Sequence, residues 1–238
     1  MQGYFMVADL LGFGNLVDNL SLEELTRRVQ AWGVLVRECA KTCGVARHQL
    51  FSDTVFADAD DSPAGLRNLI ELARKLLEEG ATQSLPIRGA ISHGSYEWGD
   101  LTYGDAVVEA HRLEMAQEWV GVACQMGLPH IEAFWGLDSV ICYPIPKKDG
   151  AIGLHPAVAW DVPTFNILAR YLTGGGLTKE RDVLDWEWGR KLANTVEFGV
   201  YSRVLKRKGE TGKTFRGRHP VEAIEVVLGE AGLIDWPV

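Results

Sequence analysis

The sequence has no excess of positive charge, no long uninterrupted apolar run and no leader of basic residues. Its 238 residues carry a net charge of −8 at pH 7, whereas a nucleic-acid binder needs an extended basic face. The apolar segment 4–17 contains Asp9, Gly12 and Gly14, so it predicts neither a signal peptide nor a membrane span. We therefore expect a cytoplasmic protein that binds neither nucleic acid nor a membrane.

Motifs typical of disulfide frameworks and of zinc sites are also missing. The four cysteines form no Cys-x-x-Cys pair, which favours reduced thiols, and the six histidines lack the spacing of metal ligands. Residues 209–214, GETGKT, resemble a phosphate-binding loop, but Arg207 stands where its first glycine belongs and a basic, helix-like segment precedes it. The remaining candidates for metal ligands are carboxylates.

The sequence does contain a pair of aspartates in apolar surroundings. Asp9 lies in VADLLGF, residues 7–13, and Asp53 in QLFSDTVF, residues 49–56, so each interrupts or ends a predicted buried strand. An unpaired buried carboxylate is costly, and two of them favour a divalent cation. Oxygen ligands that leave room for water and phosphate oxygens suit Mg²⁺ or Mn²⁺ and two-metal phosphoryl chemistry. For either aspartate alone, a turn cap is the alternative.

Apolar periodicity predicts strands that alternate with helices. The pattern gives strands at 5–10 and 121–124, hairpins at 45–59 and 87–96, and helices at 21–42, 62–80 and 104–117. Ser21 and Ser62 stand at the starts of the first two helices, where N-cap residues are expected. This order of elements predicts an α+β fold with a ferredoxin-like kernel, in which helices cover an antiparallel sheet.

Three blocks of sequence resemble the class III nucleotidyl cyclases. They are VADLLGF (7–13), FSD (51–53), and RGAISHG (88–94) followed by YGDAVVEAHRL (103–113). No block is specific alone, but their order and spacing are, and the resemblance covers about residues 4–125. It implies the fold of that family and a reaction in which a nucleoside triphosphate becomes a 3′,5′-cyclic monophosphate and pyrophosphate.

The resemblance also implies the roles of individual residues. Asp9 and Asp53 match the ligands of two Mg²⁺ or Mn²⁺ ions. Arg112 matches an arginine that stabilises the transition state from the other subunit, which implies a homodimer with composite active sites. For Arg112 alone, the alternative is a solvated helix residue that pairs with a nearby glutamate. The segment that covers the triphosphate corresponds to Leu11, Gly12, Phe13 and Gly14.

Three positions depart from the family pattern and bear on the substrate. Gln49 stands where adenylyl cyclases carry a purine-contacting lysine, Leu101 where they carry an aspartate, and Val108 where an asparagine should precede Arg112 by one turn. An amide at Gln49 can donate and accept hydrogen bonds, which suits uracil or cytosine. The chain therefore resembles the pyrimidine cyclases of Pycsar antiphage defence, with UTP favoured over CTP. A purine cyclase and a catalytically silent nucleotide-binding module are the alternatives.

The resemblance fades after about residue 160. We expect residues 1–160 to form the cyclase core and residues 161–238 to form a helical extension packed on it, not an independent domain. Apolar residues in this part predict helices over 163–172, 181–205 and 220–229. The sequence does not identify an activating signal or the target of a cyclic nucleotide.

Overall fold

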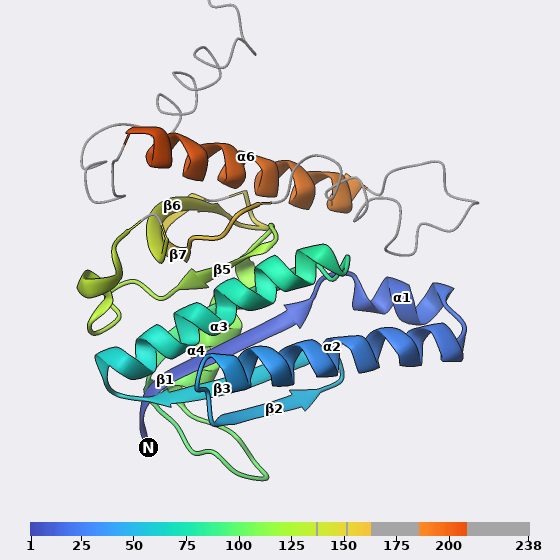
Figure 1. Cartoon of the computed structure of the whole chain (residues 1–238), viewed down its shortest axis with the longest axis horizontal. Coiled ribbons are helices and arrows are strands. Elements are labelled where there is room, and N and C mark those ends of the chain that lie inside the picture. Colours follow the sequence, from blue (N-terminus) through green and yellow to red (C-terminus); the bar gives the residue numbers. More distant parts are fainter. Residues whose placement is uncertain (137, 151, 163–185, 209–238) are drawn as a thin grey trace, which may run out of the picture.

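Seven strands form one sheet, with helices on both of its faces (Figure 1). The computed structural model describes residues 1–136, 138–150, 152–162 and 186–208. The helices predicted over 163–172 and 220–229, the segment 209–214 and the start of the helix predicted over 181–205 lie outside these ranges. None of the helices in the described ranges combines the length and the apolarity needed to cross a bilayer.

The first part of the chain forms the predicted ferredoxin-like kernel. Its strands lie in the order β2-β3-β1-β4, and each neighbouring pair is antiparallel. This confirms the α+β fold class and the central place of the strand that carries Asp9. The elements are β1 (Gln2–Leu10), α1 (Phe13–Asn19), α2 (Leu22–Thr42), β2 (Arg47–Phe51), β3 (Thr54–Asp60), α3 (Pro63–Thr82) and β4 (Ile87–Ser95).

The two long helices begin where their capping residues predict. The Ser21 hydroxyl accepts a hydrogen bond from the Glu24 N–H at 3.2 Å, and the Ser62 hydroxyl accepts one from the Gly65 N–H at 3.0 Å. Each bond satisfies an N–H group that has no partner inside its helix. Pro63 follows Ser62 at the first helical position, where a missing N–H has no cost.

The second predicted hairpin, at 87–96, is wrong. Residues 87–95 form one continuous strand, β4, because it pairs along its whole length with β1. Only a single bridge, between Glu97 and Tyr103, follows it before the next helix. The later elements are α4 (Asp105–Ala116), β5 (Gly121–Cys124), a short 3₁₀ turn η1 (Ile131–Phe134), β6 (Val140–Pro146), β7 (Ile152–Val158) and α6 (Trp186–Lys208).

Alternate residues of β1 pack against different helices. Tyr4, Met6 and Ala8 belong to the large core beneath α2 and α3. Phe5 and Val7 point to the opposite face, where they form a smaller core with residues of α4. All five side chains are essentially inaccessible to solvent. Burial on both faces makes β1 a rigid support for whatever lies at its end.

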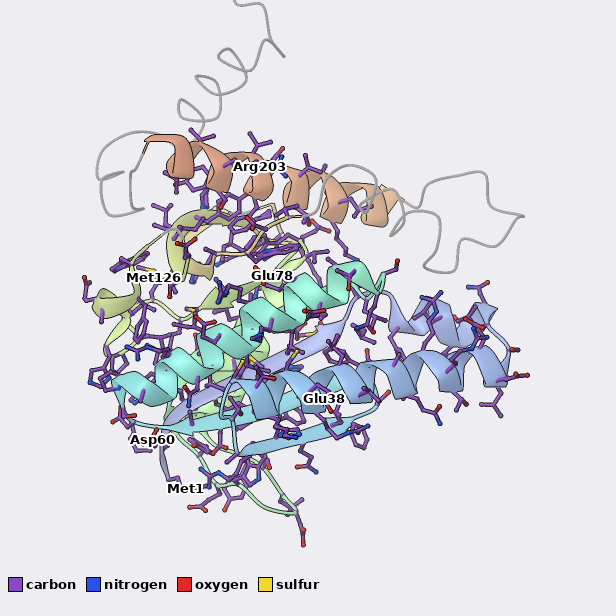
Figure 2. All side chains as sticks on the ribbon, viewed as in Figure 1. Met1, Glu38, Asp60, Glu78, Met126 and Arg203 are labelled. Atoms are coloured by element: carbon purple, nitrogen blue, oxygen red, sulfur yellow. The ribbon has the colours of Figure 1, made fainter. Side chains whose placement is uncertain are left out.

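Helix α6 covers the other end of the sheet, beside β6 and β7 (Figures 1 and 2). Phe198 packs edge to face against both Trp119 and Tyr143, with ring centroids 4.8 and 4.9 Å apart. The Thr195 hydroxyl accepts a hydrogen bond from the Val120 N–H at 2.9 Å. These contacts join α6 to the strands, while the division of the chain at residue 160 stays a prediction. All four cysteines are free thiols.

Candidate active site

Asp9 lies one residue before the end of β1, directly opposite Arg88 of β4. Its Oδ2 atom accepts a hydrogen bond from Arg88 Nη2 at 3.2 Å. Its Oδ1 atom is buried and has no hydrogen-bond partner among the described residues. A buried carboxylate oxygen without a partner is unfavourable, so this atom suits a ligand that the protein itself does not supply.

The surroundings of Asp9 raise the pKa of its carboxyl group from 3.8 to about 7. Burial is the largest cause, and the nearby charge of Arg88 offsets part of it. The carboxyl group of Glu114 and the charge of Asp53 raise the pKa further. The strand register places the two predicted metal ligands at the same end of the sheet, because Ala8, next to Asp9, pairs with Val55, two residues after Asp53.

Asp53 lies at the tip of the hairpin between β2 and β3. The preceding residue, Ser52, has a φ of 57°, in the left-handed region, which permits the tight turn between Phe51 and Thr54. The Asp53 side chain is half-buried and has no ion-pair partner in the described part of the chain. The hairpin therefore carries this carboxylate to the same end of the sheet as Asp9.

The segment predicted to cover a triphosphate connects β1 to α1. Gly12 adopts a φ of 79°, which glycine permits, and α1 begins at the next residue, Phe13. The Leu11 N–H donates a hydrogen bond to the carbonyl of Pro86 at 2.9 Å, so this N–H group is already paired within the protein. The N–H groups of Phe13 and Gly14 fall in the first turn of α1, where no intrahelical acceptor exists. Contact between this segment and phosphate stays a prediction.

Arg112 lies exposed on α4, and it has no ion-pair partner among the residues that the structure places. The structure thus shows the solvated helix position of the alternative without its glutamate pairing, and the role of Arg112 stays a prediction. Val108, one turn earlier, is also exposed, at 47%. The guanidinium of Arg112 is free to contact a ligand or a second chain.

Gln49 lies exposed on β2, opposite Phe56 of β3. It forms no hydrogen bond with another side chain in the described ranges. Leu101 lies in the loop after β4 and is 79% exposed. The structure leaves both positions available to a ligand and does not bring them into contact with Asp9.

Two charged residues near Asp9 were not predicted as site residues. Arg88 and Glu114 are 5% and 2% exposed, and Arg88 Nε donates to Glu114 Oε1 at 2.6 Å. The sequence does carry a signal for Arg88, because it is a charged residue at the start of an apolar strand. Asp9 shows the same signal near the end of its strand. Glu114 gives no such signal, since glutamate is common on helices.

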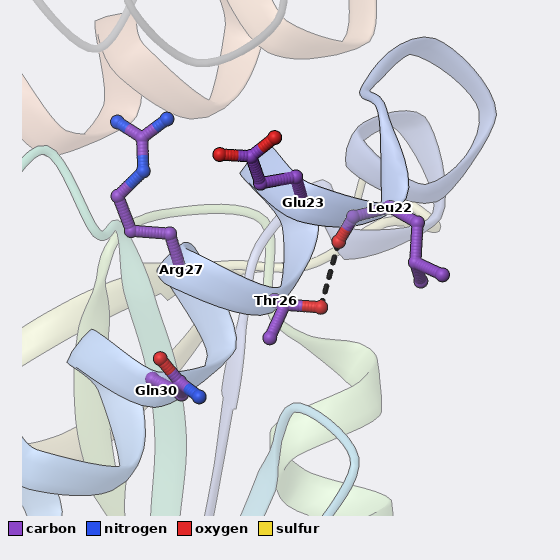
Figure 3. A pocket seen from close by; sticks show the side chains of 5 residues that line it. All are labelled: Leu22, Glu23, Thr26, Arg27 and Gln30. Carbon is purple, nitrogen blue, oxygen red and sulfur yellow. Dashed lines mark hydrogen bonds between the residues drawn. The ribbon is translucent and has the colours of Figure 1, made fainter.

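A surface hollow lies away from these residues. It is lined by Leu22, Glu23, Thr26, Arg27 and Gln30, all from the start of α2 (Figure 3). None of the predicted site residues lines it, and the Thr26 hydroxyl there donates to the carbonyl of its own helix at Leu22. One side of one helix does not make an active site, so the carboxylates remain the candidate.

The two aspartates suit a divalent cation because they are oxygen donors and because they would supply only part of its ligand shell. In the described ranges, no group of three or more His, Cys, Asp or Glu residues forms a closed metal site. Mg²⁺ usually takes one or two carboxylates and completes its shell with water and substrate phosphates. Asp9, with its unpartnered Oδ1, and Asp53 would supply the protein's share of such a shell.

The fold is that of the catalytic domains of class III nucleotidyl cyclases. The guanylate cyclase domain of RhGC from Catenaria anguillulae, solved with GTP, matches with a TM-score of 0.53 and 15% identity over 66% of this chain and 96% of that domain. The monomeric guanylyl cyclase domain of the RhoGC fusion protein from Blastocladiella emersonii gives 0.54 and 16%, over 66% and 94%. The core of a rhodopsin-guanylyl cyclase with converted specificity, solved with ATPαS, gives 0.55 and 15%, over 66% and 95%. No protein-family model and no curated protein sequence matches the chain.

The raised pKa of Asp9 predicts a pH-dependent stability. Because the folded protein holds a proton that the unfolded chain releases, the free energy of unfolding should fall as pH rises from about 4 to about 7. The Asp9→Asn variant lacks this fall. Its melting temperature should match that of the wild type near pH 4 and exceed it at pH 8, by roughly 2–4 °C for each kcal/mol. An equal difference at both pH values would show that burial does not raise this pKa.

Proposed function

We propose that this chain is a nucleotidyl cyclase, which converts a nucleoside triphosphate to its 3′,5′-cyclic monophosphate and pyrophosphate. The observation that carries the proposal is the convergence of Asp9 and Asp53 at one end of a sheet with the cyclase fold, where an Asp9 oxygen has no protein partner. The three matched domains are described as guanylyl cyclases or as a variant of one, and two of them were solved with a nucleoside triphosphate or its analogue, GTP and ATPαS.

The proposed roles follow from residue type and position. Two bound divalent cations would supply activation of the 3′ hydroxyl and neutralisation of the leaving pyrophosphate. Asp9 and Asp53 would hold them, and the segment from Leu11 to Gly14 would contact the triphosphate. Arg112 would stabilise the charge that develops on the phosphoryl group, a contribution of about 10³ to 10⁵ in rate in related phosphoryl transfers. In a homodimer this arginine would serve the partner's site.

We further propose that the substrate is a pyrimidine nucleoside triphosphate, with UTP favoured over CTP, and that the product acts as a second messenger in antiphage signalling. The support for the substrate is the amide of Gln49, which matches the purine-contacting lysine of adenylyl cyclases in sequence. Leu101 and Val108 also replace polar residues of that family. The matched domains are described as guanylyl cyclases, so a purine nucleoside triphosphate is the alternative substrate. A third candidate function, a catalytically silent nucleotide-binding module, is favoured by Val108.

One experiment separates these functions. The purified chain is incubated with Mn²⁺ and each of the four ribonucleoside triphosphates separately, and any cyclic product is identified by mass. Cyclic UMP or cyclic CMP supports the proposal, whereas cyclic AMP or cyclic GMP overturns the pyrimidine assignment. Binding of a triphosphate with no product from any of the four identifies a silent module.

The role of Gln49 gives a second, independent prediction. Replacing Gln49 with alanine should reduce discrimination among the triphosphates more than it lowers the best rate, because the amide selects the base and takes no part in the reaction. A base edge that loses its hydrogen-bond partner costs roughly 1–3 kcal/mol, which corresponds to about 5- to 150-fold in selectivity. The measurement is kcat/KM for each triphosphate, with Gln30→Ala on α2, away from the predicted site residues, as the matched control. An unchanged order of preference would place selectivity elsewhere.

A further inference from the structure

A buried guanidinium stands beside Asp9 where a cation would bind. Arg88 Nη2 contacts Asp9 Oδ2 at 3.2 Å and also contacts the carboxylate of Glu114. Both Arg88 and Glu114 are almost completely buried, and the Asp9 side chain is 20% exposed. A divalent cation at Asp9 would therefore meet a positive charge that already occupies one of the two carboxylate oxygens.

Glu114 and Asp9 share one end of Arg88, because the carboxylates of both contact its Nη2 atom. Glu114 also accepts a hydrogen bond from Arg88 Nε at 2.6 Å, and it comes from α4, whereas Asp9 comes from β1. Arg88 Nη1 also donates to the carbonyl of Gln117 at 3.3 Å, just after α4. The end of α4 thus binds the guanidinium through two residues and three of its nitrogens, whereas Asp9 binds it through one oxygen.

Several ionisable groups surround Arg88. Asp9, Asp53 and Glu114 bring three carboxylates, and Arg88 brings one positive charge in contact with two of them. Lys148, between β6 and β7, adds an exposed amine whose pKa is lowered by burial and by the charge of Arg88. His111 Nδ1 also lies 3.7 Å from Glu114 Oε2, and the unpartnered Oδ1 of Asp9 is where an added cation would be attracted.

We propose that Arg88 is an internal counter-ion that competes with a divalent cation for Asp9, and that Glu114 sets the outcome by drawing Arg88 toward α4. The inference rests on the proposed function in one respect, that Asp9 is a cation ligand. Arg88 and Glu114 are positioning residues, since they act on the cation through Asp9. Glu114 lies two residues after Arg112, so cation binding at Asp9 is linked to the helix that carries the proposed catalytic arginine.

The test measures binding of Mn²⁺ alone, without nucleotide, by the loss of the electron paramagnetic resonance signal of free Mn²⁺. The variant Arg88→Gln/Glu114→Gln removes one positive and one negative charge, so the net charge near Asp9 stays the same while the competitor is lost. We expect its Kd for Mn²⁺ to fall about tenfold, because a charge-assisted hydrogen bond no longer opposes the cation. In Glu114→Gln, Arg88 keeps Asp9 as its only carboxylate, and the Kd should rise about tenfold.

The controls separate this inference from the function beneath it. Arg74→Gln/Glu71→Gln neutralises an ion pair on α3 in the same way and should leave the Kd unchanged. Melting curves show whether each variant is folded. If the neutral double variant does not fold, Arg88→Met/Glu114→Leu replaces it, since apolar side chains remove the same two charges and leave no polar group to bury.

Each outcome decides one of the two proposals. A Kd that stays within about twofold of wild type in the folded double variant, or in Arg88→Met/Glu114→Leu, would overturn the competition. Tighter binding in that variant, with weaker binding in Glu114→Gln, supports it. If wild type binds no Mn²⁺, or Asp9→Asn binds it as tightly as wild type, the cation site itself is wrong and the proposed function fails with it.

Discussion

Replacing Asp9 with asparagine is expected to lower turnover by at least about a hundredfold while the chain stays folded. The substitution keeps the shape of the side chain and removes the charge that would hold a cation against developing negative charge. Arg88 keeps its bond to Glu114, so the buried guanidinium does not lose its counter-ion. Asp53→Asn should have the same effect for the same reason. The measurement is kcat with saturating Mn²⁺ and the best of the four triphosphates.

A matched substitution on the same strand as Asp53 gives the control. Asp60 lies at the far end of β3 and accepts a hydrogen bond from Ser62, which an asparagine oxygen would still accept. Asp60→Asn should retain wild-type turnover, because this carboxylate is exposed and remote from Asp9. Near-native rates in Asp9→Asn or Asp53→Asn would show that these residues do not hold the metal.

Mixing two inactive variants is expected to restore about a quarter of wild-type activity. If Asp9 and Asp53 of one chain face Arg112 of its partner, Asp53→Asn and Arg112→Ala chains are each inactive alone. Their mixed dimer has one site with both defects and one site with none. Random exchange of equal amounts makes about half of the dimers mixed, each with one working site of two.

The same design contains its own negative control. A mixture of Asp9→Asn with Asp53→Asn should stay inactive, because both carboxylates of any site come from one chain. Subunit exchange is followed independently, for example with differently tagged chains. If exchange occurs and the first mixture stays inactive, Asp9, Asp53 and Arg112 act within one chain and the interfacial site is wrong.

Much of the kernel could be predicted because its helices bury one face each, which spaces their apolar residues at the helical period. The helices that begin after Ser21 and Ser62 follow their caps and apolar spacing closely. Strand β6 leaves no such signal, since Pro144 and Pro146 interrupt it. The sheet order places β6 at an edge, where a proline that cannot donate a hydrogen bond is tolerated.

The same distinction applies to the site. Asp9 could be predicted because a charged residue is unusual in a strand of apolar residues, and a single stretch of sequence is enough to show it. The contact of Arg88 with Glu114 joins residues 26 positions apart on a strand and a helix. Only the packing of α4 across β4 creates that contact, so no spacing in the sequence announces it.

The two carboxylates of the proposed site differ in how their backbones move. Asp9 belongs to a strand with hydrogen-bonded neighbours on both sides, whose amides should exchange with solvent only when the whole domain unfolds. Asp53 lies at the tip of a hairpin whose outer strand, β2, is the edge of the sheet, where local opening is far easier. Hydrogen exchange should therefore be slow around Asp9 and fast around Asp53. A cation bound between them would slow hydrogen exchange at the hairpin. The exchange rate of the hairpin amides would then measure cation binding, with the slow amides of β1 as the internal reference.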